Sequence, residues 1–331
     1  MRRILSFFGG RESLLAAGCL VSGLVFAYLS PYFATTDNLF TIARNSNELL
    51  LVGLGMTLLL GIGGIDVSAG VAMGLAAIAV GRLLLVGAPP LVAALAGPIV
   101  GLALGSITAG AVVLGRIPAI VATLGLFGIF RAAIFLALGG SWLSGLPISL
   151  TNVLTANLLG APLSLFVVAI AYLAVFVAVR FTPFGAHLLA TGHSEAKARL
   201  FGVPVRRTMI AVYVVSGGLC GVAATFYVAT YRNVEMTIGS TLALEAIVAA
   251  VLGGTAVTGG RLSLLGTILG VALLRLLQNG LLLVGVPSLW QTVVTGLLLL
   301  LVLGIEALGG SQPFGRLFSA LTARPAGGGV R

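Results

Sequence analysis

Residues 83–115 read LLLVGAPPLVAALAGPIVGLALGSITAGAVVLG and carry no charged side chain over 33 positions. A helix needs about 20 apolar residues to cross the roughly 30 Å hydrocarbon core of a bilayer, so this stretch is long enough to cross one. Four further uncharged runs meet the same requirement: 13–36, 132–179, 208–231 and 276–305. Apolar and polar residues do not alternate along them, as they would in the strands of a membrane β-barrel. The sequence therefore predicts an all-α integral membrane protein.

Charged residues are scarce and unevenly placed. Only 8% of the 331 residues are charged, 59% are hydrophobic and the mean hydropathy is +1.18, whereas a soluble domain carries about 25% charged residues. The net charge of +10 comes from scattered residues, 17 arginines and one lysine, mostly beside predicted helix ends. A nucleic-acid-binding surface needs a dense basic stripe, while this pattern is typical of the positive-inside bias of cytoplasmic loops. We therefore expect membrane lipid, and no nucleic acid, around the chain.

Charge gaps and Pro/Gly breaks predict about ten transmembrane helices. Their expected ranges are 13–31, 44–63, 67–88, 90–115, 118–138, 162–180, 208–229, 243–258, 262–285 and 287–308. Ten crossings return the chain to its starting side. With the N-terminus in the cytoplasm, 13 of the 18 basic residues fall on that face: Arg2, Arg3, Arg11, Arg116, Arg180, Lys197, Arg199, Arg206, Arg207, Arg261, Arg316, Arg324 and Arg331.

These crossings divide the chain into three parts. Residues 1–12 form a cytoplasmic N-terminus, 13–308 a transmembrane domain with a long inner loop at 181–207, and 309–331 a cytoplasmic tail that we expect to be partly disordered. Outer connections lie at 31–43, 139–161 and 230–242. The first apolar run lacks an A-x-A-like cleavage site before Pro31, so we read it as an uncleaved helix and not as a signal peptide.

The inner loop encodes a short helix. Ser194 suits a helix N-cap and Glu195 suits the positive helix start. Gly202 suits a left-handed C-cap, and Pro204 prevents the helix from continuing. A helix over 195–201 would be on the order of 10 Å long, and a helix that short is marginal alone. It is either part of an ordinary solvated loop or a coupling helix that docks on a soluble partner.

The sequence lacks the residues that nucleotide hydrolysis, metal binding and enzymatic catalysis require. A P-loop needs a lysine followed by Ser or Thr, but the only lysine, Lys197, is followed by Ala198. His187 and His193 have no carboxylate pair or cysteine nearby, so we expect no metal. Cys19 and Cys220 lie inside apolar runs and read as small hydrophobic residues. No catalytic constellation is present in the sequence, so we expect no enzyme and no ATP hydrolysis by this chain.

Four segments carry a resemblance to a known family. The inner loop has the pattern T-x-x-G…A-x-G-x-x-x-x-x-A-x-x-x-G-V-x-V, and residues 63–70 read GGIDVSAG, close to G-G-I-D-L-S-V-G. Residues 118–125 read PAIVATLG, and 245–261 run from EAI through GGT to GGR. Taken together over residues 40–305, the chain resembles the ribose-type ABC permeases, the membrane subunits of binding-protein-dependent importers for simple sugars. The departures are Ala69 where the family often has valine, and Glu245 where it often has aspartate.

The resemblance implies a type II ABC importer-like permease in a bacterial inner membrane. It implies a second permease copy or paralogue, a paired or two-domain cytoplasmic ABC ATPase that uses ATP and Mg, and a periplasmic or extracellular sugar-binding protein, with no cofactor on this chain. Residues of the inner loop would couple the pore to the ATPase: Gly185, Gly192, Ser194, Glu195, Ala198 and Gly202. Changing Gly192 to proline or Glu195 to arginine should then leave the chain folded but uncoupled. Whether the solute is a pentose, a deoxyhexose or a sugar-like signalling molecule such as an autoinducer stays open.

A second set of residues marks the pathway, a gate or a helix junction: Gly63, Gly64, Asp66, Ser68, Thr123, Glu245, Gly253, Gly254 and Asn279. Asp66 either caps the helix that follows it or takes part in gating. Glu48, Arg82, Arg131 and Arg275 are further ionisable residues within or beside apolar spans. An ion-coupled secondary transporter, with Asp66 or Glu245 in a proton relay, is the alternative function. Residues 63–70 also resemble residues 253–260, which hints at an internal repeat.

Overall fold

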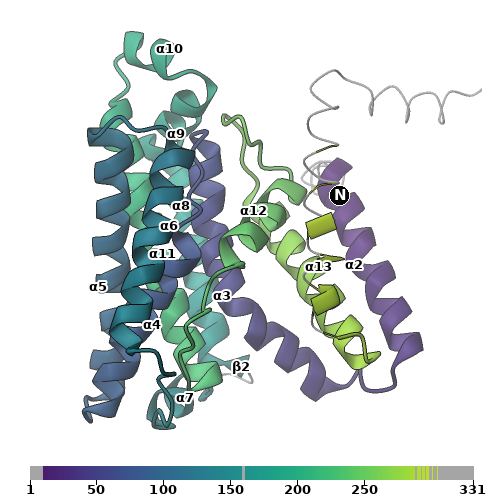
Figure 1. Cartoon of the computed structure of the whole chain (residues 1–331). Coiled ribbons are helices and arrows are strands. Elements are labelled where there is room, and N and C mark those ends of the chain that lie inside the picture. The colour runs from purple at the N-terminus through teal and green to yellow at the C-terminus, as the bar shows by residue number, and fades with distance from the viewer. Residues whose placement is uncertain are drawn as a thin grey trace, which may run out of the picture.

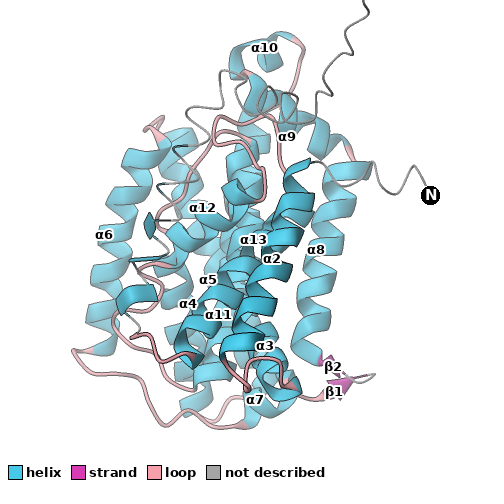
Figure 2. Ribbon diagram, turned by 90° about the vertical axis from the view of Figure 1, so that its right-hand side faces the viewer, coloured by secondary structure: helices cyan, strands magenta, loops and turns pink. Residues whose placement is uncertain are grey.

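The computed structural model of the chain describes residues 10–158, 161–287, 289–291, 293–294, 296–297, 300 and 304. This part of the chain is almost entirely helical (Figures 1 and 2). Two-residue strands β1 (Asn157–Leu158) and β2 (Ala161–Pro162) pair antiparallel. The helices are α2 (Gly10–Leu29), α3 (Thr36–Gly61), α4 (Ala69–Leu85), α5 (Pro90–Ala109) with its π-helical extension η1 (Gly110–Leu114), α6 (Ala119–Leu138), α7 (Ser149–Leu154), α8 (Leu163–Phe181), α9 (Pro183–His193), α10 (Glu195–Leu200), α11 (Val205–Tyr231), α12 (Leu242–Leu252) and α13 (Leu264–Leu283).

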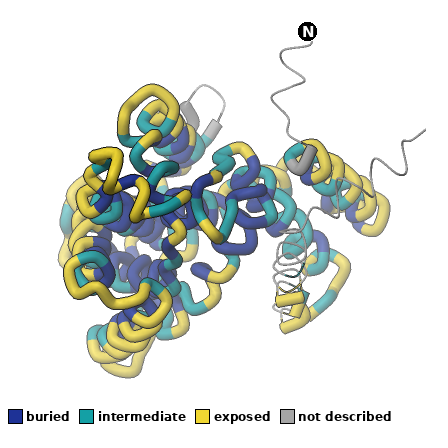
Figure 3. The backbone as a smooth tube through the Cα atoms, turned by 90° about the horizontal axis from the view of Figure 1, so that it is seen from above, coloured by how far each residue is buried: buried dark blue, intermediate teal, exposed yellow. Residues whose placement is uncertain are grey.

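The helices run between two ends of the molecule. Helices α9 and α10 lie at one end, called the α10 end below, and α7 lies at the other, the α7 end (Figure 1). Helices α4, α5, α6 and α11 form the main bundle, α8 packs against α3, and α2 and α13 pack together beside the bundle. Helix α3 contacts both groups, and its second half is almost wholly buried. Viewed from above, buried residues gather inside the main bundle and the outward faces are exposed (Figure 3).

The most extensive helix contact joins α5 to α11. Gly97, Gly101 and Gly105 recur every four residues on α5, and an added Cβ at any of them would overlap the backbone of α11. The facing residues on α11 are Gly217 and Gly221. Small residues at this spacing let two backbones approach closely, which is the main source of helix packing within a bilayer. Part of the glycine content of the sequence is therefore explained by the close packing of α5 against α11.

Six helices of the described chain are long and apolar enough to cross a membrane: 12–29, 90–114, 119–138, 163–181, 205–231 and 264–283. Helices α4 and α12 are apolar but shorter, with 17 and 11 residues. Nine of the ten predicted ranges correspond to helices of the described residues. The tenth, 287–308, lies mostly outside the described residues, as do residues 1–9 and the tail 309–331. The membrane class and helical character are thus confirmed, and the count of ten stays a prediction.

Two predicted boundaries are wrong and one helix was not predicted, each for a local reason. The helix predicted at 44–63 begins earlier, at Thr36, because Thr35 caps α3 by accepting a hydrogen bond from the Asn38 amide. The predicted helix 243–258 stops at Leu252, where the Gly253-Gly254 pair follows and Gly254 has a φ of +93°. The inner loop contains α9 in addition to α10. Thr182 as N-cap and Pro183 at the first helical position signal α9 in the sequence.

Candidate functional site

Helix α10 is a short helix capped at both ends. The Ser194 hydroxyl accepts a hydrogen bond from the Lys197 amide at 3.4 Å. At the other end Gly202 has a φ of +76°, and the Gly202 and Val203 amides donate to Arg199 and Ala198 carbonyls. This pair of bonds is a Schellman motif. The predicted helix 195–201 is confirmed to within one residue, with the predicted residues in both caps.

The outer face of α10 is exposed and partly apolar. Leu200 and Phe201 are each 85% exposed, while Ala198 on the inner side is buried. Glu195 and Arg199 form an ion pair at 3.2 Å, and their side chains are also exposed. A helix of six residues has little stability of its own, and two large apolar side chains held in the open favour contact with a partner. The sequence patterns did not single out Leu200 or Phe201.

Helix α9 joins α10 to the main bundle through glycines. A Cβ at Gly185 would overlap the backbone of Val179 at the end of α8. A Cβ at Gly192 would overlap the carbonyl of Gly61 and lie 2.5 Å from the amide nitrogen of Gly260. Gly192 therefore has no room for a side chain. These contacts argue against the expectation that Gly192→Pro leaves the fold intact, because the half-buried Gly192 packs against the backbone of both Gly61 and Gly260 and not on the face of α10.

Two glycine-rich breaks meet beside Gly192. The first, 62–68, connects α3 to α4, and the second, 253–263, connects α12 to α13. The Gly260 amide donates a hydrogen bond to the Gly61 carbonyl at 3.0 Å. Gly63 and Gly254 both have positive φ, at +74° and +93°. Both breaks thus follow helices that run toward the α10 end, in agreement with the likeness between residues 63–70 and 253–260.

The first break is fixed by Asp66 and Ser68. One carboxylate oxygen of the buried Asp66 accepts hydrogen bonds from the Ser68 amide at 2.8 Å and its hydroxyl at 2.5 Å. This is a local turn that leads directly into α4. The Thr123 hydroxyl of α6 donates to the Ile65 carbonyl at 3.5 Å. Asp66, Ser68 and Thr123 therefore lie together, so two of the four sequence motifs meet at this junction.

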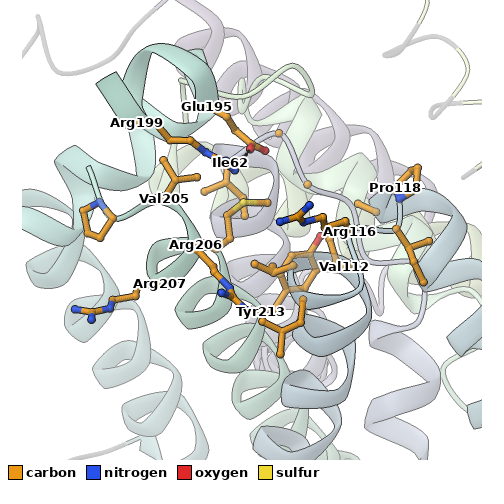
Figure 4. Close-up of a pocket in the computed structure, with 18 residues that line it drawn as sticks. Ile62, Val112, Arg116, Pro118, Glu195, Arg199, Val205, Arg206, Arg207 and Tyr213 are labelled. Carbon is orange, nitrogen blue, oxygen red and sulfur yellow. Dashed lines mark hydrogen bonds and ion pairs between the residues drawn. The ribbon is translucent and has the colours of Figure 1, made fainter. Parts of the chain in front are cut away.

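A cavity of about 1010 Å³ opens at the same end of the bundle (Figure 4). It lies between the first break, η1, the start of α6, α10 and the start of α11. Tyr213 lies at its inner side; this side chain is buried, and its hydroxyl has no hydrogen-bond partner among the described residues. The charged residues that line the cavity are Arg116, Glu195, Arg199, Arg206 and Arg207. The cavity is therefore strongly basic and includes the ion pair of α10.

Nearer the α7 end, a second polar cluster lies inside the protein. Tyr231 donates a hydrogen bond to the Glu48 carboxylate at 3.1 Å, and Thr241 donates to Glu245 at 3.2 Å. Arg275 forms an ion pair with Glu245 at 3.6 Å. These residues come from α3, α11, α12, α13 and the segment before α12. They line a pocket of about 290 Å³.

Comparison with known proteins gives the family. The model of the family described as "Branched-chain amino acid transport system / permease component" matches residues 38–303. The chain belongs to this permease family. It is 32% identical to the ribose import permease protein RbsC of Escherichia coli over 305 residues, which cover 89% of this chain and 93% of the relative. It is 36% identical over 299 residues to the autoinducer 2 import system permease protein LsrC of an Enterobacter species, covering 90% and 84%. No solved structure matches the chain.

The permease is therefore a multi-pass inner-membrane subunit of an ABC importer, and ATP hydrolysis is carried by a separate subunit. This membership supports ATP-driven import and not the ion-coupled alternative. Among the described residues, no group of three or more His, Cys, Asp or Glu side chains could hold a metal ion.

The structure distributes the predicted site residues of the permease over three places. The first is α9–α10, with Gly185, Gly192, Ser194, Glu195, Ala198 and Gly202. The second is the pair of breaks, with Gly63, Gly64, Asp66, Ser68, Thr123, Gly253 and Gly254; a Cβ at Gly253 would overlap Gly266. The third is the cluster of Glu245. Asn279 belongs to none of these, because it exchanges two hydrogen bonds with Asn38 between α13 and the start of α3.

Sequence reasoning missed the residues that complete these places. Gly61 and Tyr213 lie within apolar runs with no distinguishing pattern of their own. Tyr231 carries no local signal, although its place at the end of an apolar helix fits an aromatic residue with a polar tip. Glu48 and Arg275 were recognisable as ionisable residues in apolar surroundings. Only the fold shows that both lie beside Glu245.

Proposed function

We propose that the permease forms one half of the pore of an ATP-driven importer for a sugar or a sugar-like solute. The two relatives named above are import permeases for ribose and for autoinducer 2, which supports a small hydroxylated solute. A second copy of the chain or a paralogue completes the pore. A binding protein outside the membrane delivers the solute, and a cytoplasmic ABC ATPase, paired or two-domain, supplies ATP hydrolysis with Mg. The permease itself binds no cofactor.

In this proposal α10 is the coupling helix. The observation that carries it is the position of Gly192, in the last turn of α9, against the backbones of both breaks. A displacement of α10 by the ATPase is passed through α9 to Gly61 and Gly260, because these backbones are in contact with no side chain between them. Each break ends one helix and precedes the next, so such a displacement changes the packing of four helices at once. Leu200 and Phe201 form the exposed apolar surface that the ATPase would contact.

The orientation of the chain follows from the same proposal. The α10 end faces the cytoplasm, and the α7 end faces the binding protein. The basic cavity in Figure 4 then opens to the cytoplasm, in keeping with the positive-inside bias. Ten crossings, including residues 287–308, would place both termini in the cytoplasm.

The test alters only the outer face of α10. Leu200→Asp with Phe201→Asp should reduce co-purification with the ATPase at least tenfold and abolish ATP-dependent sugar uptake in proteoliposomes, because the burial of two apolar side chains is lost. Glu195→Arg should weaken both by placing like charges opposite Arg199. The control variant is Asp37→Asn, at an exposed residue at the start of α3. Full ATPase association and uptake in the double variant would refute the coupling role.

A further inference from the structure

The pocket near Glu245 is built by backbone that enters the bundle without forming a helix. The segment 232–241 starts at the α7 end, where Leu143 and Val234 form a β-bridge. It then reaches Gly70 at the start of α4, since a Cβ at Gly70 would overlap the Gly239 carbonyl. Gly81, further along α4, faces Leu143, and the step of eleven positions from Gly70 to Gly81 corresponds to a rise of about 16 Å. Non-helical backbone at such depth is tolerated where it is buried in protein or lines a watery cavity.

Glu235 and five consecutive residues from Thr237 to Thr241 line this pocket. The opposite walls are formed by side chains of the surrounding helices, namely Glu48, Met73, Tyr227, Tyr231, Leu242, Glu245 and Arg275. The rings of Tyr227 and Tyr231 pack against each other with centroids 4.6 Å apart. The pocket therefore combines an aromatic pair with hydroxyl, carboxylate and guanidinium groups in a volume of about 290 Å³. This lies at the small end of the range of about 300–1,000 Å³ for ligand pockets.

Two of its charged groups keep free hydrogen-bonding capacity. Among the described residues, Glu245 Oε2 and Arg275 Nε are buried and have no hydrogen-bond partner. Glu245 Oε2 faces Arg275 Nη1 at 3.6 Å, which is an ion pair but too long for a hydrogen bond, and Nη1 donates instead to Gln278 Oε1 at 2.6 Å. The two side chains are only 14% and 17% exposed. Buried polar atoms without partners are rare, and each requires a cause. Charges at this depth are costly and usually serve a pathway or a ligand.

The chemistry of the pocket favours a neutral hydroxylated ligand over a cation. Three carboxylates and one guanidinium line it, yet no group of three acidic, His or Cys side chains in the described residues converges as a metal site. Arg275 would repel a cation. A hydroxyl group, in contrast, donates to a carboxylate and accepts from a guanidinium or a tyrosine, so one polyol satisfies both kinds of group.

We propose that this pocket is a solute-contact site at which Glu48, Tyr231, Glu245 and Arg275 exchange hydrogen bonds with a polyhydroxylated solute during its passage. The assignment rests on the proposed function. The solute should bind weakly, because the polar groups of the pocket already form hydrogen bonds with one another, from Tyr231 to Glu48 and from Thr241 to Glu245. A transport pathway needs such a site, since a solute that is held tightly cannot leave.

The test uses the complete importer in proteoliposomes, with its ATPase and its binding protein. Radiolabelled ribose, rhamnose and glucose are offered to the wild type, and a sugar that it accumulates becomes the probe. The main variant is Glu245→Gln with Arg275→Gln, which removes both charges and leaves two amides that can pair. We expect uptake to fall about tenfold, the effect of losing one charge-assisted hydrogen bond, while ATP hydrolysis stimulated by the loaded binding protein falls less than twofold. Glu48→Gln should behave alike, and Asp37→Asn on the same helix should change neither rate.

The ratio of sugar moved to ATP hydrolysed separates the outcomes. A parallel fall in both rates would show that the cluster only supports the fold, and unchanged uptake would show that it does not contact the solute; either result overturns the assignment and leaves the proposed function standing. A requirement of wild-type uptake for Na⁺ or K⁺ that the double variant loses would replace the assignment with a cation site. If the wild type accumulates none of the sugars, the proposed solute class fails and the assignment fails with it.

Discussion

Gly192→Ala tests the contact between α9 and the two breaks directly. The added methyl group would overlap the Gly61 carbonyl and lie 2.5 Å from the Gly260 nitrogen, whereas an ordinary contact is 3.4 Å or more. Both obstacles are backbone atoms, so no side chain can rotate away. The two breaks must move apart, and the 3.0 Å hydrogen bond from the Gly260 amide to the Gly61 carbonyl lies at the point of overlap.

The magnitude follows from three contributions. Forcing an extra methyl group into a packed interior costs about 1–3 kcal/mol. Loss of the Gly260–Gly61 hydrogen bond adds about 1 kcal/mol, and alanine regains about 1 kcal/mol over glycine within a helix. The last two cancel, which leaves a net destabilisation of about 1–3 kcal/mol. For a chain of 331 residues, the midpoint of thermal unfolding should fall by about 1.5–4 °C.

The assay heats the detergent-solubilised permease and measures the monodisperse fraction by size-exclusion chromatography, followed by ATP-dependent uptake in proteoliposomes at a temperature where both proteins are folded. Gly128→Ala on α6 is the matched control, because no atom lies within 4 Å of its added Cβ. It should keep or raise the midpoint. We expect Gly192→Ala to lower both the midpoint and uptake. A variant as stable and as active as the control would refute the contact and the coupling route through it.

Two further predictions concern the junction and the bundle. Asp66→Ala should lower the free energy of unfolding by about 1 kcal/mol, because it removes the acceptor for Ser68, whereas Asp66→Asn keeps an oxygen there and should match the wild type. Thermal unfolding and uptake of the two variants check this. Loss of uptake in a stable Asp66→Asn protein would point to gating instead. Gly101→Ala should separate α5 from α11, because its Cβ would lie 2.8 Å from the Gly221 nitrogen and overlap Gly217, so its unfolding midpoint should fall relative to Gly128→Ala; equal midpoints would contradict the close packing.

Local structure could be predicted wherever the residues act on their immediate neighbours. Ser194 and Gly202 specify both ends of α10 because caps need only a few consecutive residues. The wrong end of the predicted helix 243–258 also has a local cause, because the Gly253-Gly254 pair allows the chain to turn within an apolar stretch. Thr182-Pro183 was an available signal for α9. Asn279 shows the limit, since its partner Asn38 comes from the other end of the chain.

By itself, the sequence determined that the protein lies in a membrane, and it placed nine of its apolar helices and the two caps of α10. These properties depend on the average apolarity of some twenty residues or on the φ preference of a single glycine, and both can be read along the chain. Only the tertiary structure decided which breaks touch, and that Glu48, Glu245 and Arg275 line one pocket. Such meetings depend on how close two backbones can approach, and that distance is set by pairs of residues far apart in the sequence, as where Gly192 lies between Gly61 and Gly260.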